Sequence, residues 1–234
     1  VLRDEAVRTQ TGRNRPALRP TSYVDTVAGM RSLLCYGDSN TWGYVPVTAR
    51  YPRDVRWPGR LQVALGDEWH VVEEGLNGRT ATLDSPIAPG RNGLTYLVPC
   101  LLTHALIDTV VIYLGTNDVS DRYSLPAADV AAGVARLALV VKRTPECGVD
   151  ERPPRVILVC PPSFEENEVF ADTMTGAVEK SQQLGRWYRE HAALVGAELI
   201  DLADVTRYSR LDGIHLDEEG HAAVAAAVAR AVTA

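Results

Sequence analysis

The stretch SLLCYGDSN, residues 32–40, joins a short apolar run to a turn that carries a serine. A continuous apolar run of about four to eight residues, bounded by turn formers, is typical of a strand buried inside a parallel sheet. A serine on the turn that leaves such a strand lies at the carboxyl edge of the sheet, where open α/β folds place their sites. The stretch therefore predicts an α/β fold with a parallel sheet, and it makes Ser39 a candidate nucleophile.

Beyond Met30 the chain alternates strand patterns with helix patterns, as expected for a parallel sheet that has helices on both faces. No internal repeat and no break in composition after residue 30 indicates a second domain. We therefore predict a single-domain, three-layer α/β/α sandwich with a five-stranded parallel sheet over residues 31–234. The predicted strands are 32–36, 70–74, 109–114, 155–160 and 198–201, and the predicted helices are 57–65, 96–105, 125–141, 174–195 and 218–232.

Residues 1–30 are predicted to be an N-terminal extension. They show no clear period, contain Pro16 and Pro20, and lack the apolar core of a secretory signal. Three interpretations stay open: a true extension, a remnant that is not native, or a start placed upstream of the real initiator, Met30. We expect the segment to be mobile unless it docks on a neighbour.

The composition excludes several kinds of partner. The formal net charge of the 234 residues is −6 and the chain has no dense basic stripe, which argues against nucleic acid. No segment approaches the ~20 consecutive apolar residues of a membrane-spanning helix. Only two of the 24 basic residues are lysines, and with the alanine-rich helices this skew suggests a GC-rich bacterial genome.

The cysteines indicate in which cellular compartment the protein is expected. They do not have the spacing of a metal site, and two of them fall in apolar runs, where a free thiol is usually a small buried hydrophobe. We predict mainly structural thiols, no metal site and a reduced, cytoplasmic setting, with a disulfide as the weaker alternative. The four cysteines are Cys35, Cys100, Cys147 and Cys160.

Polar segments follow the predicted strands one after another. GDSN (37–40) follows the first strand, EGLNGRT (74–80) the second, GTND (115–118) the third and PPS (161–163) the fourth, and DGIH (212–215) comes after the fifth. All of them are expected at the carboxyl edge of the sheet. Each alone is ordinary turn chemistry, so their common placement is what indicates a site.

The last segment adds the remaining parts of an acyl-transfer site. Asp212 precedes His215 by three residues, so one loop can supply an orienting acid and a general base. Serine, histidine and aspartate form such triads in any chain order, because roles and geometry define them. We therefore predict Ser39, His215 and Asp212 as the catalytic residues. The alternative for Asp212 and His215 is a cap at the start of the last helix.

These segments resemble the blocks of the SGNH (GDSL-type) hydrolase superfamily, from about residue 31 to the C-terminus. Block I contains Ser39, although Asn40 stands where leucine is commoner. Gly78 matches block II, Asn117 block III, and DGIH block V. The stretches TWGYVP, DVRW and EEGL are similar to those of small bacterial arylesterases that also act as acyltransferases. The resemblance implies a flavodoxin-like SGNH fold.

The resemblance also implies a mechanism. Ser39 attacks an ester carbonyl, His215 takes and returns the proton, and Asp212 orients the imidazole. The oxyanion hole consists of the backbone N–H groups of Ser39 and Gly78 and the side-chain amide of Asn117. A glycine at position 78 is expected to let the backbone approach the substrate without a Cβ. Neither a metal nor an organic cofactor is implied, and small members of this group often form homo-oligomers.

The predicted function is hydrolysis of short-chain acyl or aryl esters, small molecules, through an acyl-enzyme. An apolar approach to Ser39 suits such esters, and acyl transfer to alcohols is expected from the resemblance. A carbohydrate O-acetyl esterase is the alternative enzyme. An inactive binding module that keeps the fold is the alternative of another class. The predicted substrate-binding residues are Trp42, Tyr44, Pro46 and Pro162, with Val45 and Trp57 as further candidates; each has core packing as its alternative.

Residues outside the triad receive structural predictions. Asp38 and Asp118 are expected to hold their loops through backbone amides, and Arg79 to anchor the block II loop through a carboxylate. The other histidines show no carboxylate or cysteine at ligand spacing along the chain, so we expect surface or packing roles for them. They are His70, His104, His191 and His221.

Overall fold

Five parallel strands form the centre of the computed structural model, in the order β2-β1-β3-β4-β5. The structure describes residues 29–46 and 49–234, so the extension predicted at 1–30 lies almost wholly outside the described residues. The predicted five-stranded parallel sheet is confirmed. The strands are β1 (Arg31–Gly37), β2 (Trp69–Gly75), β3 (Thr109–Tyr113), β4 (Arg155–Cys160) and β5 (Glu198–Asp201).

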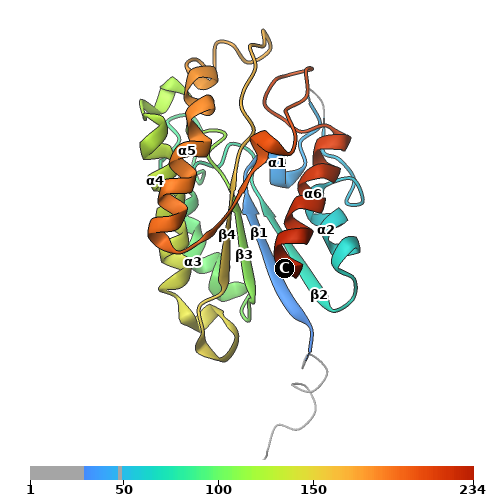
Figure 1. Ribbon diagram of the computed structural model, residues 1–234. Helices are drawn as coiled ribbons and strands as arrows, with labels where there is room; N and C mark the ends of the chain where they lie inside the picture. The colour runs from blue at the N-terminus through green and yellow to red at the C-terminus, as the bar shows by residue number, and fades with distance from the viewer. Residues whose placement is uncertain (1–28, 47–48) are drawn as a thin grey trace, which may run out of the picture.

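Helices cover both faces of this sheet (Figure 1). Three of them, α3 (Gly93–Thr103), α4 (Ala127–Lys142) and α5 (Ala177–Val195), lie on one face, and α2 (Trp57–Leu65) and α6 (Glu218–Thr233) lie on the other. The predicted three-layer sandwich is therefore confirmed. The shorter elements are α1 (Ser39–Trp42), η1 (Asp121–Tyr123), η2 (Pro145–Cys147), η3 (Val149–Glu151) and η4 (Leu202–Asp204).

The central strands are apolar along their whole length because both of their faces are covered. All five residues of β3 and the last five of β1 are buried, without the alternation of a half-exposed strand. In the register of the sheet, Gly37 at the end of β1 pairs with Gly75 of β2 and Tyr113 of β3. The three strands therefore end side by side, and the loops that follow them meet at one edge.

Three helix starts differ from the sequence-based prediction. Helix α3 begins at Gly93 instead of 96, because the Asn92 side chain caps it by accepting a hydrogen bond from Leu94 N at 3.0 Å. Helix α4 begins at Ala127 instead of 125, after Pro126, and helix α5 begins at Ala177 instead of 174, so Met174 lies in the loop before it. Helix α1 was not predicted, since a single turn is too short to show a helical period.

The thiols agree with the structural role expected from the sequence. All four cysteines are free and buried, and burial raises the pKa of Cys100 to about 12. Among the helices of residues 29–46 and 49–234, none combines the length and the apolar character needed to cross a bilayer.

Candidate active site

The structure brings Ser39, His215 and Asp212 together in one hydrogen-bonded chain. His215 Nε2 lies 3.0 Å from Ser39 Oγ, and His215 Nδ1 lies 2.8 Å from Asp212 Oδ2. The serine and histidine are 176 residues apart in the sequence. Their exposed fractions are 5% and 6%, and Asp212 is fully buried. Charge that develops on this chain is therefore shielded from bulk water, where electrostatic interactions are weaker.

Asp212 is held by three N–H groups. Its Oδ1 accepts from Ile214 N at 3.1 Å and from His215 N at 3.0 Å, and its Oδ2 faces the imidazole. One oxygen therefore fixes the backbone of the loop while the other is reserved for His215 Nδ1. This arrangement determines which carboxylate oxygen meets the ring, so the aspartate cannot be replaced by its amide without a conflict.

The turn that carries Ser39 is capped by Asp38. Its Oδ1 accepts from Asn40 N at 2.9 Å, as expected for a residue that holds this turn. The carboxyl group is fully buried, and burial raises its pKa to about 6. The cap places Ser39 in the first residue of α1, directly at the carboxyl end of β1.

The residues predicted for an oxyanion hole lie in one hollow of about 390 Å³, which we call the serine pocket. Ser39, Gly78 and Asn117 all line it, together with His215. Gly78 has φ = +71°, and a Cβ there would meet only the Arg91 side chain, at 3.9 Å. The left-handed backbone therefore favours a glycine at this position, and the close approach to a substrate stays a prediction.

The block II and block III loops are tied to each other. Asn117 Nδ2 donates to the Arg79 carbonyl at 3.0 Å, and Asp118 Oδ1 accepts from Ala81 N at 2.9 Å. Asp118 thus bonds a backbone amide, as expected for a residue that holds the block III loop, and this amide belongs to the segment after block II. Burial raises the pKa of Asp118 to about 7, and the Asp38 carboxylate adds to the effect.

Arg79 holds the block II loop through carbonyl groups, so the prediction of a carboxylate partner is wrong. Its guanidinium donates to the carbonyls of Gly37, at 2.9 Å, and Glu74. It also lies 4.2 Å above the ring of Tyr36. These carbonyls stand at the ends of β1 and β2, where the ladder between the strands stops and an outside donor can reach them.

Aromatic rings flank the imidazole of His215. The Tyr44 ring centroid lies 4.4 Å from the imidazole centroid, and the Phe170 ring approaches edge-on at 6.0 Å. Both rings line the serine pocket, with Ile87, Met174 and Ile214. These side chains form an apolar wall beside the candidate base.

Of the four predicted substrate-binding residues, Tyr44 lines the serine pocket, whereas Trp42, Pro46 and Pro162 do not. The ring of Trp42 lies next to that of Tyr44, at 6.3 Å between centroids, and the Arg50 guanidinium lies over it at 4.7 Å. Pro46 and Pro162 are buried. The same holds for Trp57, which packs fully buried in the core. For these residues the packing alternative describes the structure.

Sequence reasoning missed several residues that line the serine pocket. Phe170 and Met174 come from the connection between β4 and α5, which has no periodic pattern. Arg91 and Arg122 come from the connections around blocks II and III. The only signal was the position of these connections after β2, β3 and β4, on the edge where the site was expected.

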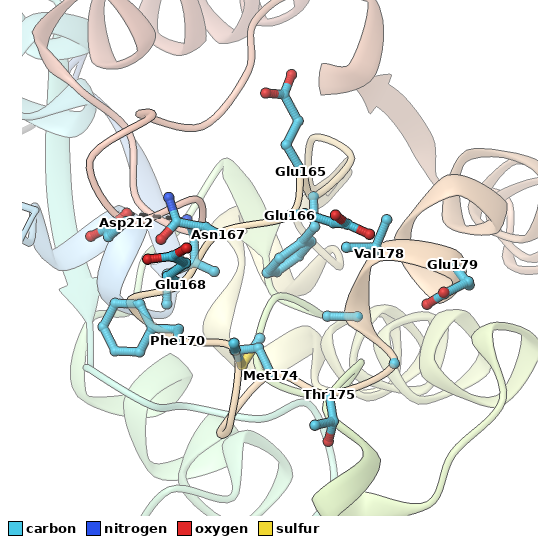
Figure 2. Close-up of a pocket in the computed structure, with 15 residues that line it drawn as sticks. Glu165, Glu166, Asn167, Glu168, Phe170, Met174, Thr175, Val178, Glu179 and Asp212 are labelled. Atoms are coloured by element: carbon cyan, nitrogen blue, oxygen red, sulfur yellow. Dashed lines mark hydrogen bonds between the residues drawn. The ribbon is translucent and has the colours of Figure 1, made fainter.

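A second hollow, of about 530 Å³, is lined largely by the β4–α5 connection and the start of α5 (Figure 2). It shares Phe170, Met174 and Ile214 with the serine pocket. We call it the acidic pocket, because its lining includes Glu165, Glu166, Glu168 and Glu179. The β4–α5 connection therefore contributes side chains to both hollows.

Two histidines outside the site have specific partners. His104 Nε2 lies 2.9 Å from Glu74 Oε1, although the sequence showed no carboxylate partner for it. The ligand atoms of Glu74, Cys100 and His104 all lie within 4.8 Å of one another. His221 is buried, its Nδ1 accepts from Trp57 N at 3.3 Å, and burial lowers its pKa to about 3.

The fold and the site together define a class. A serine, an imidazole and a carboxylate are bonded in that order at the carboxyl edge of an open parallel sheet, an arrangement that is compatible with acyl transfer. The family model of the GDSL-like lipase/acylhydrolase family matches residues 35–223. The chain belongs to this family and is an ester hydrolase.

Solved structures of bacterial esterases share this fold. A carbohydrate acetylesterase from Sinorhizobium meliloti is 36% identical, with a TM-score of 0.83 over 87% of this chain and 98% of that one. The native aryl esterase of M. smegmatis is also 36% identical, with a TM-score of 0.82 over the same shares. A putative arylesterase from Agrobacterium tumefaciens is 34% identical, with a TM-score of 0.79 over 87% and 99%. A comparison with curated proteins finds no match.

Proposed function

We propose that Ser39 is the nucleophile, His215 the general base and Asp212 the residue that orients it. The carrying observation is the hydrogen-bonded chain from Asp212 Oδ2 through His215 to Ser39 Oγ, with distances of 2.8 and 3.0 Å. Both distances allow direct proton transfer or orientation without a bridging water. The alternative of a helix cap does not apply to Asp212, since Asp217 caps α6.

The reaction proceeds in two halves. Ser39 Oγ attacks the ester carbonyl while its proton moves to His215 Nε2; the tetrahedral intermediate collapses, and the alcohol leaves with that proton. Water then attacks the acyl-enzyme and gives a proton to His215, and Ser39 Oγ takes this proton back as the acid leaves. Where an alcohol takes the place of water, the second half yields a new ester, which is the acyl transfer that the family resemblance implies.

The oxyanion is stabilised by the backbone N–H groups of Ser39 and Gly78 and by Asn117 Nδ2. An amide NH₂ group has two hydrogens. The bond to the Arg79 carbonyl uses one of those on Asn117, which leaves the other for the substrate. The bond also holds Gly78 and Asn117 in a fixed relation, so the donors are already in place when charge develops.

The serine pocket supports short acyl or aryl esters as substrates. Its volume of about 390 Å³ and its wall of Tyr44, Phe170 and Met174 suit a small apolar group. A second candidate, a carbohydrate O-acetyl esterase, is favoured by the polar part of the same lining. That part consists of Asn77, Ser85, Arg91, Ser120, Arg122 and Thr173.

The test is hydrolysis of p-nitrophenyl esters from acetate to decanoate by the wild type and Ser39→Ala. We expect turnover that is fastest with short acyl groups and that is lost in Ser39→Ala. Ser32→Ala, on β1 near the opposite edge of the sheet, is the control and should keep full activity. Activity that persists in Ser39→Ala would contradict the proposed nucleophile. If the wild type hydrolysed none of these esters, and no acetylated sugar either, the result would favour the inactive binding module.

Rates on phenyl acetate and on acetylated xylose or glucose separate the two candidate substrate classes. Preference for the aryl ester supports the first candidate, and preference for the sugar ester the second. Adding a modest concentration of an alcohol and measuring ester against acid tests acyl transfer. Release of acid alone would contradict it.

A homo-oligomer is proposed from the family resemblance and from one surface. Exposed apolar side chains lie on α3 and just after it, at Tyr96, Val98, Leu102 and Leu106. Such a patch on a surface helix is typical of contact sites between proteins. Light scattering of the purified protein measures the assembly, and a monomer at micromolar concentration would contradict it.

A further inference from the structure

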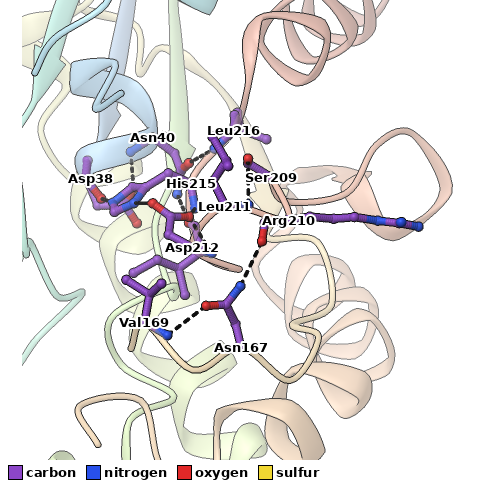
Figure 3. Close-up of polar contacts among 12 residues, drawn as sticks. Asp38, Asn40, Asn167, Val169, Ser209, Arg210, Leu211, Asp212, His215 and Leu216 are labelled. Atoms are coloured by element: carbon purple, nitrogen blue, oxygen red, sulfur yellow. Dashed lines mark hydrogen bonds and ion pairs between the residues drawn. The ribbon is translucent and has the colours of Figure 1, made fainter. Parts of the chain in front are cut away.

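We infer that Asn40 is a positioning residue that holds His215 in place relative to Ser39; the inference rests on the catalytic roles proposed above. Asn40 directly follows Ser39 in α1, and its side chain reaches the loop that carries the histidine (Figure 3). Asn40 Nδ2 donates to the Ile214 carbonyl at 3.1 Å, and Asn40 Oδ1 accepts from Leu216 N at 2.9 Å. The two bonds therefore bracket His215 on both sides.

The geometry of these bonds is that of a peptide pairing with a neighbouring strand. An amide side chain presents a donor and an acceptor in one plane, and it pairs with the carbonyl and the N–H of two residues that flank a third. The leucine that is commoner at this position in the family's block I offers neither group. The pairing thus depends on the amide, and it bridges segments about as far apart in the sequence as the serine and the histidine themselves.

Asn40 completes the bonding of the histidine backbone. Asp212 Oδ1 accepts from the N–H groups of Ile214 and His215, and Ser209 N donates to the His215 carbonyl at 2.8 Å. With the two bonds from Asn40, every backbone N–H and carbonyl from Ile214 N to Leu216 N has a partner. The histidine backbone is therefore fixed from two directions, by its own loop and by the nucleophile turn.

Burial makes this connection costly to lose. Asn40 is 1% exposed, so water cannot readily replace its amide. If the amide were removed, the Ile214 carbonyl and the Leu216 N–H would lose their partners in a buried environment. The loop would then shift to satisfy them, and His215 Nε2 would move away from Ser39 Oγ. Proton transfer is sensitive to such a shift, because misplacement by about 1 Å can cost about 10²-fold in rate.

The test compares Asn40→Leu with Gln62→Leu. Gln62 on α2 is a matched control, since its amide also bridges backbone groups: it accepts from Val71 N at 2.8 Å and donates to the carbonyls of Trp69 and Gly66 at 2.7 and 3.1 Å. Both variants should lose thermal stability. We expect only Asn40→Leu to lose kcat, by about 10- to 100-fold, while KM stays within about twofold.

A second readout is the rate at which a p-nitrophenyl phosphate triester modifies Ser39, since this reaction also needs the base beside the serine. Asn40→Leu should slow it, and Gln62→Leu should not. If Asn40→Leu does not fold, the comparison is made between Asn40→Asp and Gln62→Glu. Each of these keeps the acceptor and loses the donor, so Asn40→Asp should lose kcat relative to the wild type and Gln62→Glu should not.

Equal kcat losses in the Asn40 and Gln62 variants at equal stability would overturn the inference, because Asn40 would then be merely structural. So would an unchanged rate of Ser39 modification in the Asn40 variants. These outcomes are separate from a failure of the proposed function, which would appear as unchanged activity in Ser39→Ala or as an inactive wild type. In the latter case the rate of Ser39 modification still tests the role of Asn40.

Discussion

Asn117 and Arg79 are joined by a hydrogen bond of 3.0 Å from the Asn117 side-chain amide to the Arg79 carbonyl, which links the block III loop to the block II loop. Asn117 therefore has two roles in the proposed mechanism: it holds the Gly78 segment and donates to the oxyanion. Asn117→Ala should lower kcat by about 10²- to 10³-fold, the usual cost of one oxyanion donor. Steady-state kinetics on a short-chain ester measures the loss.

Asn167→Ala is the control for Asn117→Ala. Its Nδ2 donates to the Arg210 carbonyl, also at 3.0 Å, but it lines the acidic pocket and not the serine pocket. The control should lose a comparable hydrogen bond and keep kcat within about twofold. A similar loss in both variants would show that the effect comes from loosened loops, and the oxyanion role of Asn117 would have to be abandoned.

A comparison of Gly78 with Gly90 separates the stability cost of a left-handed backbone from an effect on catalysis. Their φ angles are +71° and +72°, and a Cβ would meet the Arg91 side chain at 3.9 Å in the first case and nothing within 4 Å in the second. Alanine should therefore cost each site about 1–2 kcal/mol of stability through left-handed strain. Only Gly78→Ala should also lower kcat, because a backbone shift that relieves the strain at this position also moves the Gly78 N–H, a proposed oxyanion donor. Urea unfolding and kinetics of both variants check this, and equal kinetics in the two would contradict it.

Asp212→Asn should lower kcat by about 10⁴-fold while the fold is kept. The N–H groups of Ile214 and His215 both need an acceptor at the Oδ1 position, so the asparagine must turn its NH₂ toward His215 Nδ1. The imidazole would then carry its proton on Nε2, where it must instead accept one from Ser39. Asp217→Asn is the control: it caps α6 through Gly220 N at 2.8 Å, and asparagine caps equally well. Full activity in Asp212→Asn would disprove the proposed role.

The sheet could be predicted from the sequence because its strands are short apolar runs that are buried along their length. β4 was predicted with its exact bounds, and the end of β1 was missed by one residue, Gly37. The polar residues after the strands were found for the same reason, since the register places the ends of β1, β2 and β3 side by side. These are local patterns, which can be recognised in the sequence without knowledge of the tertiary structure.

The walls of the serine pocket could not be predicted, because long-range contacts position them. The β4–α5 connection is held by bonds such as Ser120 Oγ to the Thr173 carbonyl, at 2.7 Å, across more than fifty residues. No local pattern shows that Phe170 and Tyr44 line the serine pocket while Trp42 does not. The role inferred for Asn40 could not be predicted for the same reason, because its partners lie near the other end of the chain.

His221 should make the stability of the fold depend on pH. Burial lowers its folded-state pKa to about 3, whereas an unfolded histidine titrates near 6.5. Between these values the unfolded chain binds more protons, so this contribution to stability is complete above about pH 6.5 and falls by about 1.4 kcal/mol per pH unit on acidification. Asp38 and Asp118 act in the opposite direction: their raised pKa values, about 6 and 7, favour the fold at low pH, and that stability is lost as the pH rises from about 4 to 7.

Because these two pH dependences oppose one another, the free energy of unfolding of the wild type alone changes little with pH. Subtracting the free energy of unfolding of His221→Asn leaves the contribution of His221. The free energy of unfolding of the wild type minus that of His221→Asn should fall by about 1.4 kcal/mol per unit between pH 6 and 4. Denaturant unfolding of the wild type and of His221→Asn at several pH values measures it. A difference for His221→Asn that does not change with pH would show that this imidazole accepts a proton inside the fold as readily as in the unfolded chain.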